Sequence, residues 1–305
     1  MRPAMSRLLE VLHSGRVLLM DGAIGTELHR AGLTKGECGE IWNVTHPERV
    51  RAVHQAYVDA GAEVLLTNTF QAYRPVLSRH LGEGQHFISD YIEAAKDIIE
   101  PFVSDNRYAL YSGGPIVEPP DSTEFPNLLD FASSALSALS VKLYTHPASP
   151  ISGILLETCS TPRVRFAVGR VRWGGVPVLL SLTYLRGAKG RITTLSGHAP
   201  EWFARRATDW GVAALGVNCG RDIGMDEIIA IVRRYRQETD LPLFARPNAG
   251  TPTQRDGRWV YPHSAESMAA RLPELIEAGA TMIGGCCGTT PKHIAAFRRV
   301  IDSLR

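Results

Sequence analysis

The chain has 305 residues, of which 44% are hydrophobic, so it can bury a sizeable core. Its 33 basic and 31 acidic residues give a formal net charge of +2, which favours neither nucleic acid nor an anionic membrane over small-molecule partners. No run of about 18 apolar residues is present, so no membrane span is expected. Glu10, His13 and Arg16 interrupt the apolar stretch that a signal peptide would need. Five cysteines, an odd number, argue against a disulfide scaffold and for a reducing, cytoplasmic setting.

One unit recurs along the chain, a short apolar run that stops at Gly, Asn, Thr, Ser or Cys. Continuous apolar runs are typical of strands that are buried on both faces, as in parallel sheets. The runs are VLLMDG (17–22), VLLTNTF (64–70), YALYSGG (108–114), GILLETCS (153–160), VLLSLTY (178–184), AALGVNCG (213–220), LPLFARPNAG (241–250) and TMIGGCCG (281–288).

Helical patterns lie between most of these runs. After the first run, Thr45 is predicted to cap a helix, with Glu48 as its capping-box partner. Apolar residues at helical spacing over 50–60 form the buried face of this helix, and Gly61 ends it.

Later segments repeat the helical pattern. Residues 225–237 and 264–279 are predicted helices, and Pro273 starts a new helix or kinks the second one. A weakly patterned helix is predicted around RVRFAVGRV (163–171), and Thr290 is predicted to cap the last helix.

Eight βα units in about 300 residues predict a single-domain (β/α)8 TIM barrel over residues 1–305. The alternative is an open doubly wound sheet, but no G-x-G-x-x-G follows the first strand. A long polar loop is expected at 118–127. In a barrel the strand ends gather at one mouth. This mouth would hold Asp21, Asn68, Thr69, Glu157, Ser181, Asn218, Cys219, Asn248, Cys286 and Cys287.

Three cysteines are therefore predicted to meet at the mouth. Cys219 ends the sixth strand and Cys286 and Cys287 end the eighth, so with strands ~4.8 Å apart one ion could join them. Adjacent residues of a strand face opposite ways, and the glycines of GGCCG permit the backbone to leave the strand. Three thiolates favour zinc and leave a fourth ligand position open. The alternatives are small buried cysteines or a redox pair, although C-x-x-C spacing is lacking.

The charge of such a centre indicates its chemistry. Zn²⁺ with three thiolates carries a charge of −1, which makes it a weaker Lewis acid than zinc held by neutral histidines. It suits an incoming thiol, which it would deprotonate and hold as a nucleophile, whereas a free thiol of pKa ~8.5 is mostly protonated at neutral pH. The implied reaction is S-alkylation of a small thiol.

The chain resembles the homocysteine S-methyltransferases, which include betaine- and S-methylmethionine-dependent enzymes and the homocysteine module of cobalamin-dependent methionine synthase. This resemblance implies a zinc-bearing barrel that methylates homocysteine to methionine, with zinc on Cys219, Cys286 and Cys287. The matching motifs are MDGAIGTEL (20–28), HPERVRAVHQAYVDAGAEVLLTNTF (46–70), LLET (155–158), GVNC (216–219), PNAG (247–250) and IGGCCGTTPKHI (283–294).

The resemblance also implies roles for residues around the metal. Asp21 and Glu157 would hold the amino group of homocysteine, and the backbone N–H groups of Gly22 and Ala23 would take its carboxylate. Asn248 would lend an oxygen to zinc when homocysteine is absent. The remaining residues, Asn68 and Thr69, would line the mouth.

Three loops depart from the family pattern, namely YSGGPIVEPPD (111–121), CSTPRVRFAVGR (159–170) and SLTYLRGAKGRITT (181–194). They would face the methyl donor, whose identity stays open. No corrinoid or folate module is recognised, which favours S-methylmethionine or S-adenosylmethionine, with Trp42 or Tyr73 contacting a cationic donor. The alternatives are a methyl-accepting module that acts with a separate corrinoid protein, and a non-catalytic zinc- or thiol-binding barrel.

Overall fold

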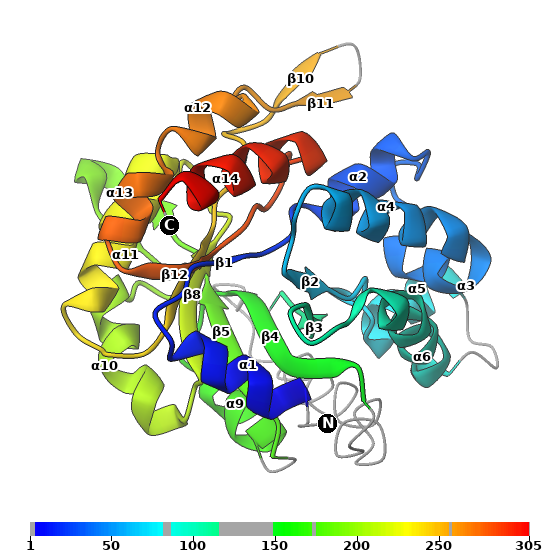
Figure 1. The fold of residues 1–305 in the computed structure, drawn as a ribbon, viewed down its shortest axis with the longest axis horizontal. Helices are drawn as coiled ribbons and strands as arrows, with labels where there is room; N and C mark the ends of the chain where they lie inside the picture. The colour runs from blue at the N-terminus through cyan, green and yellow to red at the C-terminus, as the bar shows by residue number, and fades with distance from the viewer. Residues whose placement is uncertain (1–3, 82–86, 116–148, 173–174, 256–257, 305) are drawn as a thin grey trace.

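Eight parallel strands form one sheet in the computed structural model, which describes residues 4–81, 87–115, 149–172, 175–255 and 258–304. The strand order is β1-β12-β9-β8-β5-β4-β3-β2, and a parallel bridge from Met20 to Val64 brings the two edges together. Helices surround the sheet (Figure 1), so the predicted (β/α)8 barrel is confirmed. The loop predicted at 118–127 lies outside the described residues.

Each predicted apolar run coincides with one barrel strand. Their residues are almost all buried, as expected for strands covered on both faces. The strands are β1 (Leu18–Leu19), β2 (Val64–Leu66), β3 (Tyr108–Gly113), β4 (Ile151–Cys159), β5 (Val178–Leu182), β8 (Ala214–Asn218), β9 (Leu243–Arg246) and β12 (Ala280–Ile283).

The described helices alternate with the strands as the sequence predicts. Among these helices, none has both the length and the apolar character that a membrane span requires. The α-helices are α1 (Ala4–Leu12), α2 (Ile24–Arg30), α3 (Trp42–Thr45), α4 (Pro47–Asp59), α5 (Arg74–Leu81), α6 (Ile88–Ile99), α9 (Val164–Arg172), α10 (Pro200–Trp210), α11 (Met225–Arg236), α12 (Ala265–Ala269), α13 (Leu272–Glu277) and α14 (Pro291–Ser303). Short additions are the 3₁₀ helices η1 (Gly39–Ile41), η2 (Glu100–Phe102) and η3 (Ala188–Gly190), and the hairpins β6–β7 (Leu185–Arg186, Ile192–Thr193) and β10–β11 (Thr253–Arg255, Arg258–Val260).

The predicted cap at Thr45 is wrong. Thr45 ends α3, where its hydroxyl donates to the carbonyl of Ile41 at 3.2 Å. The next helix, α4, begins instead at Pro47, because a proline at the first helical position lacks only an N–H group that would have no helical partner.

The helix starts predicted at Pro273 and Thr290 are confirmed. Pro273 lies at the start of α13, so a new helix begins there after α12. Thr290 immediately precedes α14, and its backbone N–H donates to Nδ1 of His293 at 3.2 Å.

The barrel interior is filled by side chains near the beginnings of the strands. Leu18, Val64 and Tyr108 belong to one buried cluster with Leu8 and Leu12 of α1, which packs against it. Because this packing fills the N-terminal end of the barrel, open space remains at the C-terminal ends of the strands.

Candidate metal and substrate site

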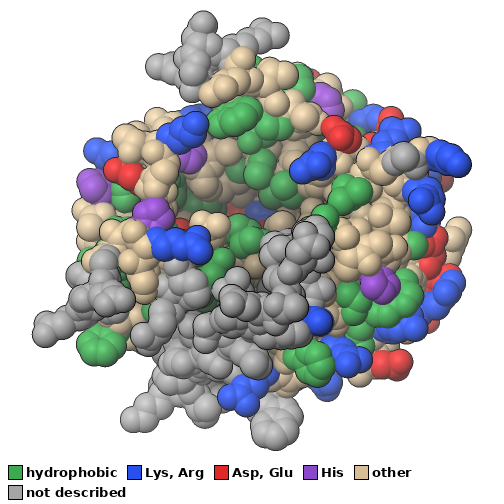
Figure 2. All heavy atoms as spheres, turned by 180° about the vertical axis from the view of Figure 1, so that it is seen from behind, with side chains coloured by type: hydrophobic (Ala, Val, Ile, Leu, Met, Phe, Trp, Pro, Cys, Tyr) green, Lys and Arg blue, Asp and Glu red, His purple; other side chains and the backbone are tan. Residues whose placement is uncertain are grey.

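A cavity of about 480 Å³ lies at the C-terminal ends of the strands. The molecular surface is hollowed on this face (Figure 2). The lining includes Cys219, Cys286, Cys287, Asn68 and Glu157. Residues from four strand ends thus meet around one space, as the barrel prediction requires.

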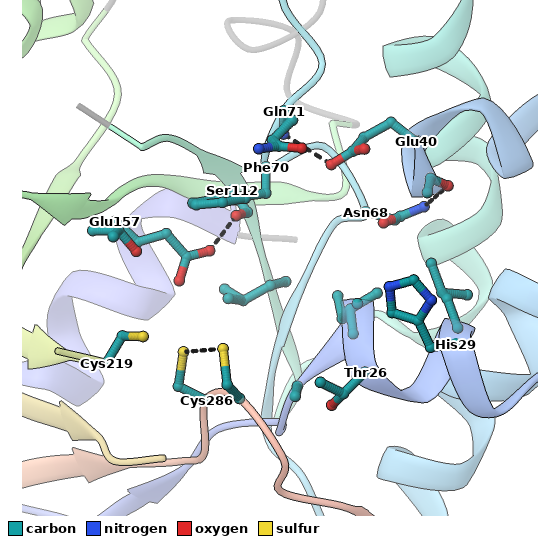
Figure 3. Close-up of a pocket in the computed structure, with 18 of the residues that line it drawn as sticks. Thr26, His29, Glu40, Asn68, Phe70, Gln71, Ser112, Glu157, Cys219 and Cys286 are labelled. Atoms are coloured by element: carbon teal, nitrogen blue, oxygen red, sulfur yellow. Dashed lines mark hydrogen bonds between the residues drawn. The ribbon is translucent and has the colours of Figure 1, made fainter. Parts of the chain in front are cut away.

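The three predicted cysteine ligands converge at this cavity. Their Sγ atoms all lie within 4.8 Å of one another, and those of Cys286 and Cys287 are 4.0 Å apart. Cys219 faces this pair from the end of β8 (Figure 3). A tetrahedral zinc site with Zn–S bonds of ~2.3 Å places its sulfurs ~3.8 Å apart, so the donor set fits zinc after small side-chain adjustments.

The backbone leaves the strand before the paired cysteines, as predicted. β12 ends at Ile283. Beyond it, the N–H of Cys286 donates to the carbonyl of Pro247, and the carbonyl of Cys287 accepts from Ala249, both at 2.9 Å. The N–H groups of Gly284 and Cys286 thus continue the contacts to β9 and the segment after it. The register shifts by one residue at Cys287, and both thiols lie close to Cys219.

The three thiols are hydrogen-bonded to one another. Hydrogen bonds from Cys286 and Cys287 lower the pKa of Cys219. The bonds to Cys219 in turn raise the pKa of Cys286 and raise the pKa of Cys287 to about 12. Nδ2 of Asn248 also donates to Sγ of Cys219 at 3.4 Å. Cys219 is therefore the thiol of the cluster whose hydrogen bonds most favour ionisation.

The side-chain amide of Asn248 contacts Cys219 and carries an oxygen without a hydrogen-bond partner among the described residues. This oxygen, Oδ1, is buried. A buried oxygen without a partner, on a side chain that contacts Cys219, is a suitable further ligand for a metal ion.

The two predicted carboxylates are brought together by Arg246, at the end of β9. Its Nη1 donates to Glu157 Oε2 at 2.8 Å, and its Nη2 donates to Asp21 Oδ1 at 3.2 Å. The carbonyl of Gly22 accepts a further bond from Nη2 at 3.2 Å. All three charged side chains are at least nine-tenths buried.

The remaining predicted site residues divide into two groups. Asn68 lines the cavity, and its Nδ2 donates to the side chain of Asn43 and to the carbonyl of Gly39, both at 2.9 Å. Ala23 also lines it, but its N–H already donates to Thr289 Oγ1 at 3.1 Å. The predicted residues that are not part of the described lining are Asp21, Gly22, Thr69, Ser181, Asn218 and Asn248.

Sequence reasoning missed Arg246. The sequence did contain an indication of its role, since Arg246 is the charged residue at the end of the otherwise apolar run LPLFAR. A charge buried in a strand needs a partner. The two aromatic residues proposed to contact a cationic donor, Trp42 and Tyr73, are not part of the described cavity lining, whereas Phe70 is. Trp42 is buried beneath the guanidinium of Arg49, 4.9 Å from its ring centroid.

The protonation of Asp21 gives a pH-dependent prediction. Burial raises the pKa of Asp21 to about 7, against the opposing effect of Arg246. In the unfolded chain the pKa of an aspartate is ~3.9, so the folded protein binds the proton of Asp21 more tightly. This proton binding therefore stabilises the fold fully below pH ~4, and the stabilisation is lost as pH rises towards 7.

Asp21→Asn should remove this loss of stability with rising pH. As pH rises from 4 to 7, the free energy of unfolding of the variant is expected to increase relative to that of the unmodified protein. Urea unfolding of both metal-free proteins at a series of pH values measures this, and a constant difference would contradict the raised pKa.

A barrel with three thiols converging at its mouth belongs to the class of (β/α)8 proteins suited to hold a metal ion through sulfur. Comparison with known proteins agrees. The family model for homocysteine S-methyltransferases matches residues 18–301, and the chain belongs to that family.

Relatives and solved structures agree with this assignment. The chain is 29% identical to methionine synthase of Mycobacterium tuberculosis over 329 residues and 30% identical to that of Mycobacterium leprae over 318, covering 98% and 94% of this chain. It spans about a quarter of the length of these relatives, 26% and 24%. The metallated homocysteine methyltransferase MmuM of Escherichia coli is similar in structure, with a TM-score of 0.73, 25% identity, and coverage of 96% of this chain and 99% of that one.

Proposed function

We propose that the protein transfers a methyl group to the thiol of homocysteine, giving methionine, with zinc held by Cys219, Cys286 and Cys287. The observation that carries this proposal is the convergence of three thiols at the wall of a cavity. Membership of the family and the metallated state of the MmuM relative support it.

Zinc bound by three thiolates would keep the acceptor sulfur deprotonated, which a free thiol at neutral pH is mostly not. The protein's own residues fix the cluster. Asn218, which immediately precedes Cys219, accepts from the hydroxyl of Ser181 at 2.6 Å and from the N–H of Thr158 at 3.1 Å. These bonds hold the end of β8 and orient its thiol.

The reaction is a displacement at the methyl carbon. The acceptor sulfur forms a bond to that carbon, the bond from carbon to the donor breaks, and the thiol proton goes to solvent. Catalysis then depends on positioning the two reactants in line. The polar end of the acceptor lies toward Glu157 and Arg246, which line the same cavity as the thiols.

A cationic donor, a sulfonium or a quaternary ammonium, fits the other part of the cavity. Glu40 is 6% exposed and lines this part together with Phe70. Its oxygens accept from the N–H of Gln71 at 2.8 Å and the thiol of Cys38 at 3.1 Å, both neutral donors. Within the described part of the chain it forms no ion pair, and a buried carboxylate favours a positive partner.

Glu40→Gln therefore tests the donor assignment. The substitution keeps the size of the side chain and removes its charge, so KM for a cationic donor should rise at least about tenfold, since opposite unit charges ~4 Å apart attract by ~4 kcal/mol at an effective dielectric constant of ~20. The dissociation constant of homocysteine should not change. Equal KM values for Glu40→Gln and the unmodified protein would argue against a cationic donor near Glu40.

A separate corrinoid protein is the second candidate donor. The similarity of this chain to the methionine synthases of two mycobacteria favours it, because the family that the chain resembles includes cobalamin-dependent methionine synthase.

A donor screen tests the function as a whole. Homocysteine is incubated with S-methylmethionine, S-adenosylmethionine, betaine or a methylated corrinoid protein, and methionine formation and zinc content are measured together. Methionine formed from at least one donor is expected. Bound zinc without methionine from any donor would instead indicate a non-catalytic metal-binding barrel.

A further inference from the structure

Arg246 occupies the position between the two carboxylates that the family resemblance assigns to the amino group of homocysteine. Its guanidinium reaches Glu157 at 2.8 Å and Asp21 and the carbonyl of Gly22 at 3.2 Å each. It comes from β9, while its partners follow β1 and lie in β4. A single cation of the protein therefore links both acidic groups.

The other oxygen of each carboxylate also has a donor from the protein. Oδ2 of Asp21 accepts from the N–H of Leu66 at 2.7 Å. Oε1 of Glu157 accepts from the hydroxyl of Ser112 (Figure 3). All four carboxylate oxygens are thus engaged without a ligand.

Charge agrees with the geometry. An arginine side chain stays protonated in proteins, so Arg246 compensates one of the two acids. Burial raises the pKa of Asp21 to about 7, so this acid can take up a proton in place of a second cation. Asp21 has no exposed surface and is not part of the described cavity lining. Glu157 and Arg246 are both part of that lining. An ammonium group in the cavity could approach Glu157 but would meet the guanidinium beside it.

We infer that Arg246 is the built-in counter-ion of Asp21 and Glu157 and determines acceptor specificity, so that the site binds small thiols with little dependence on an amino group. This inference rests on the proposed function, because it takes the thiol to be the methyl acceptor. Asp21 is then a positioning residue that holds Arg246, and Glu157 and Arg246 together meet the polar end of the acceptor.

Calorimetric titration of the zinc-loaded protein tests this directly. The ligands are homocysteine and 4-sulfanylbutanoate, which has the same chain, thiol and carboxylate but no amino group. The unmodified protein is expected to bind the two within tenfold of each other. A preference for homocysteine of tenfold or more would overturn the inference, and this comparison needs no variant.

Arg246→Met supplies the second test, with Arg246→Lys as the matched control that keeps the charge. In the methionine variant an ammonium can take the vacated position, so the preference for homocysteine over 4-sulfanylbutanoate should rise at least tenfold. In the lysine variant it should stay within threefold of the unmodified protein. An unchanged or smaller preference in Arg246→Met would overturn the inference, since a purely structural role would weaken both ligands equally.

The two proposals fail in different ways. If neither thiol binds while zinc is retained, the proposed function is wrong and the inference falls with it. If both thiols bind with a strong preference for homocysteine in the unmodified protein, only the role of Arg246 is wrong.

Discussion

Cys219→Ala is expected to abolish stable zinc binding and to lower kcat/KM for thiol methylation by more than about a thousandfold. Substitution of a residue that only supports a metal ligand already costs ~10–100-fold, and Cys219 is itself a predicted ligand. Two thiols would remain, fewer than the three protein ligands typical of a catalytic zinc site. Metal content after dialysis and steady-state kinetics measure the two losses.

Cys159→Ala is the matched control. Cys159 is fully buried, lies in the packed layer between strands and helices, and does not belong to the cysteine cluster. The control should therefore retain stoichiometric zinc and most of its turnover. If Cys219→Ala retained zinc and turnover as Cys159→Ala does, the metal assignment would be wrong.

Much of the fold could be predicted because its determinants are local. Each barrel strand is a continuous apolar run, and each run ends in residues that favour a turn, so the eight strands could be located from the sequence alone. The convergence of Cys219 with Cys286 and Cys287 followed from the barrel geometry, because parallel strands end at one face.

Residue patterns did not predict those features in which two local signals compete or two distant segments meet. Thr45 offered a good capping side chain, but Pro47 decided where α4 begins. The N–H of Ala23 donates to Thr289, and the carboxylate of Asp21 accepts from Arg246. Both partners lie more than two hundred positions further along the chain. Such pairings depend on the relative heights of strands around the barrel, which residue patterns do not encode.

Gly284 explains why the paired cysteines need glycines before them. A Cβ atom at this position would lie 2.6 Å from Cβ of Met20 and 2.7 Å from the carbonyl oxygen of Asp21. Neither neighbour is the end of a flexible side chain, so β12 and the end of β1 would have to separate. The segment that carries Cys286 and Cys287 would move with it.

We therefore expect Gly284→Ala to lower the free energy of unfolding by about 1–3 kcal/mol, the usual cost of overpacking, and to weaken zinc binding at least tenfold. Gly169→Ala in α9 is the control, because a Cβ there has no atom within 4 Å. Alanine favours a helix over glycine by roughly 0.5–1 kcal/mol, so this control should be slightly more stable than the unmodified protein. Urea unfolding and competitive zinc titration of both variants measure the difference, and equal stability and zinc affinity of the two would show that close contact at Gly284 does not position the cysteines.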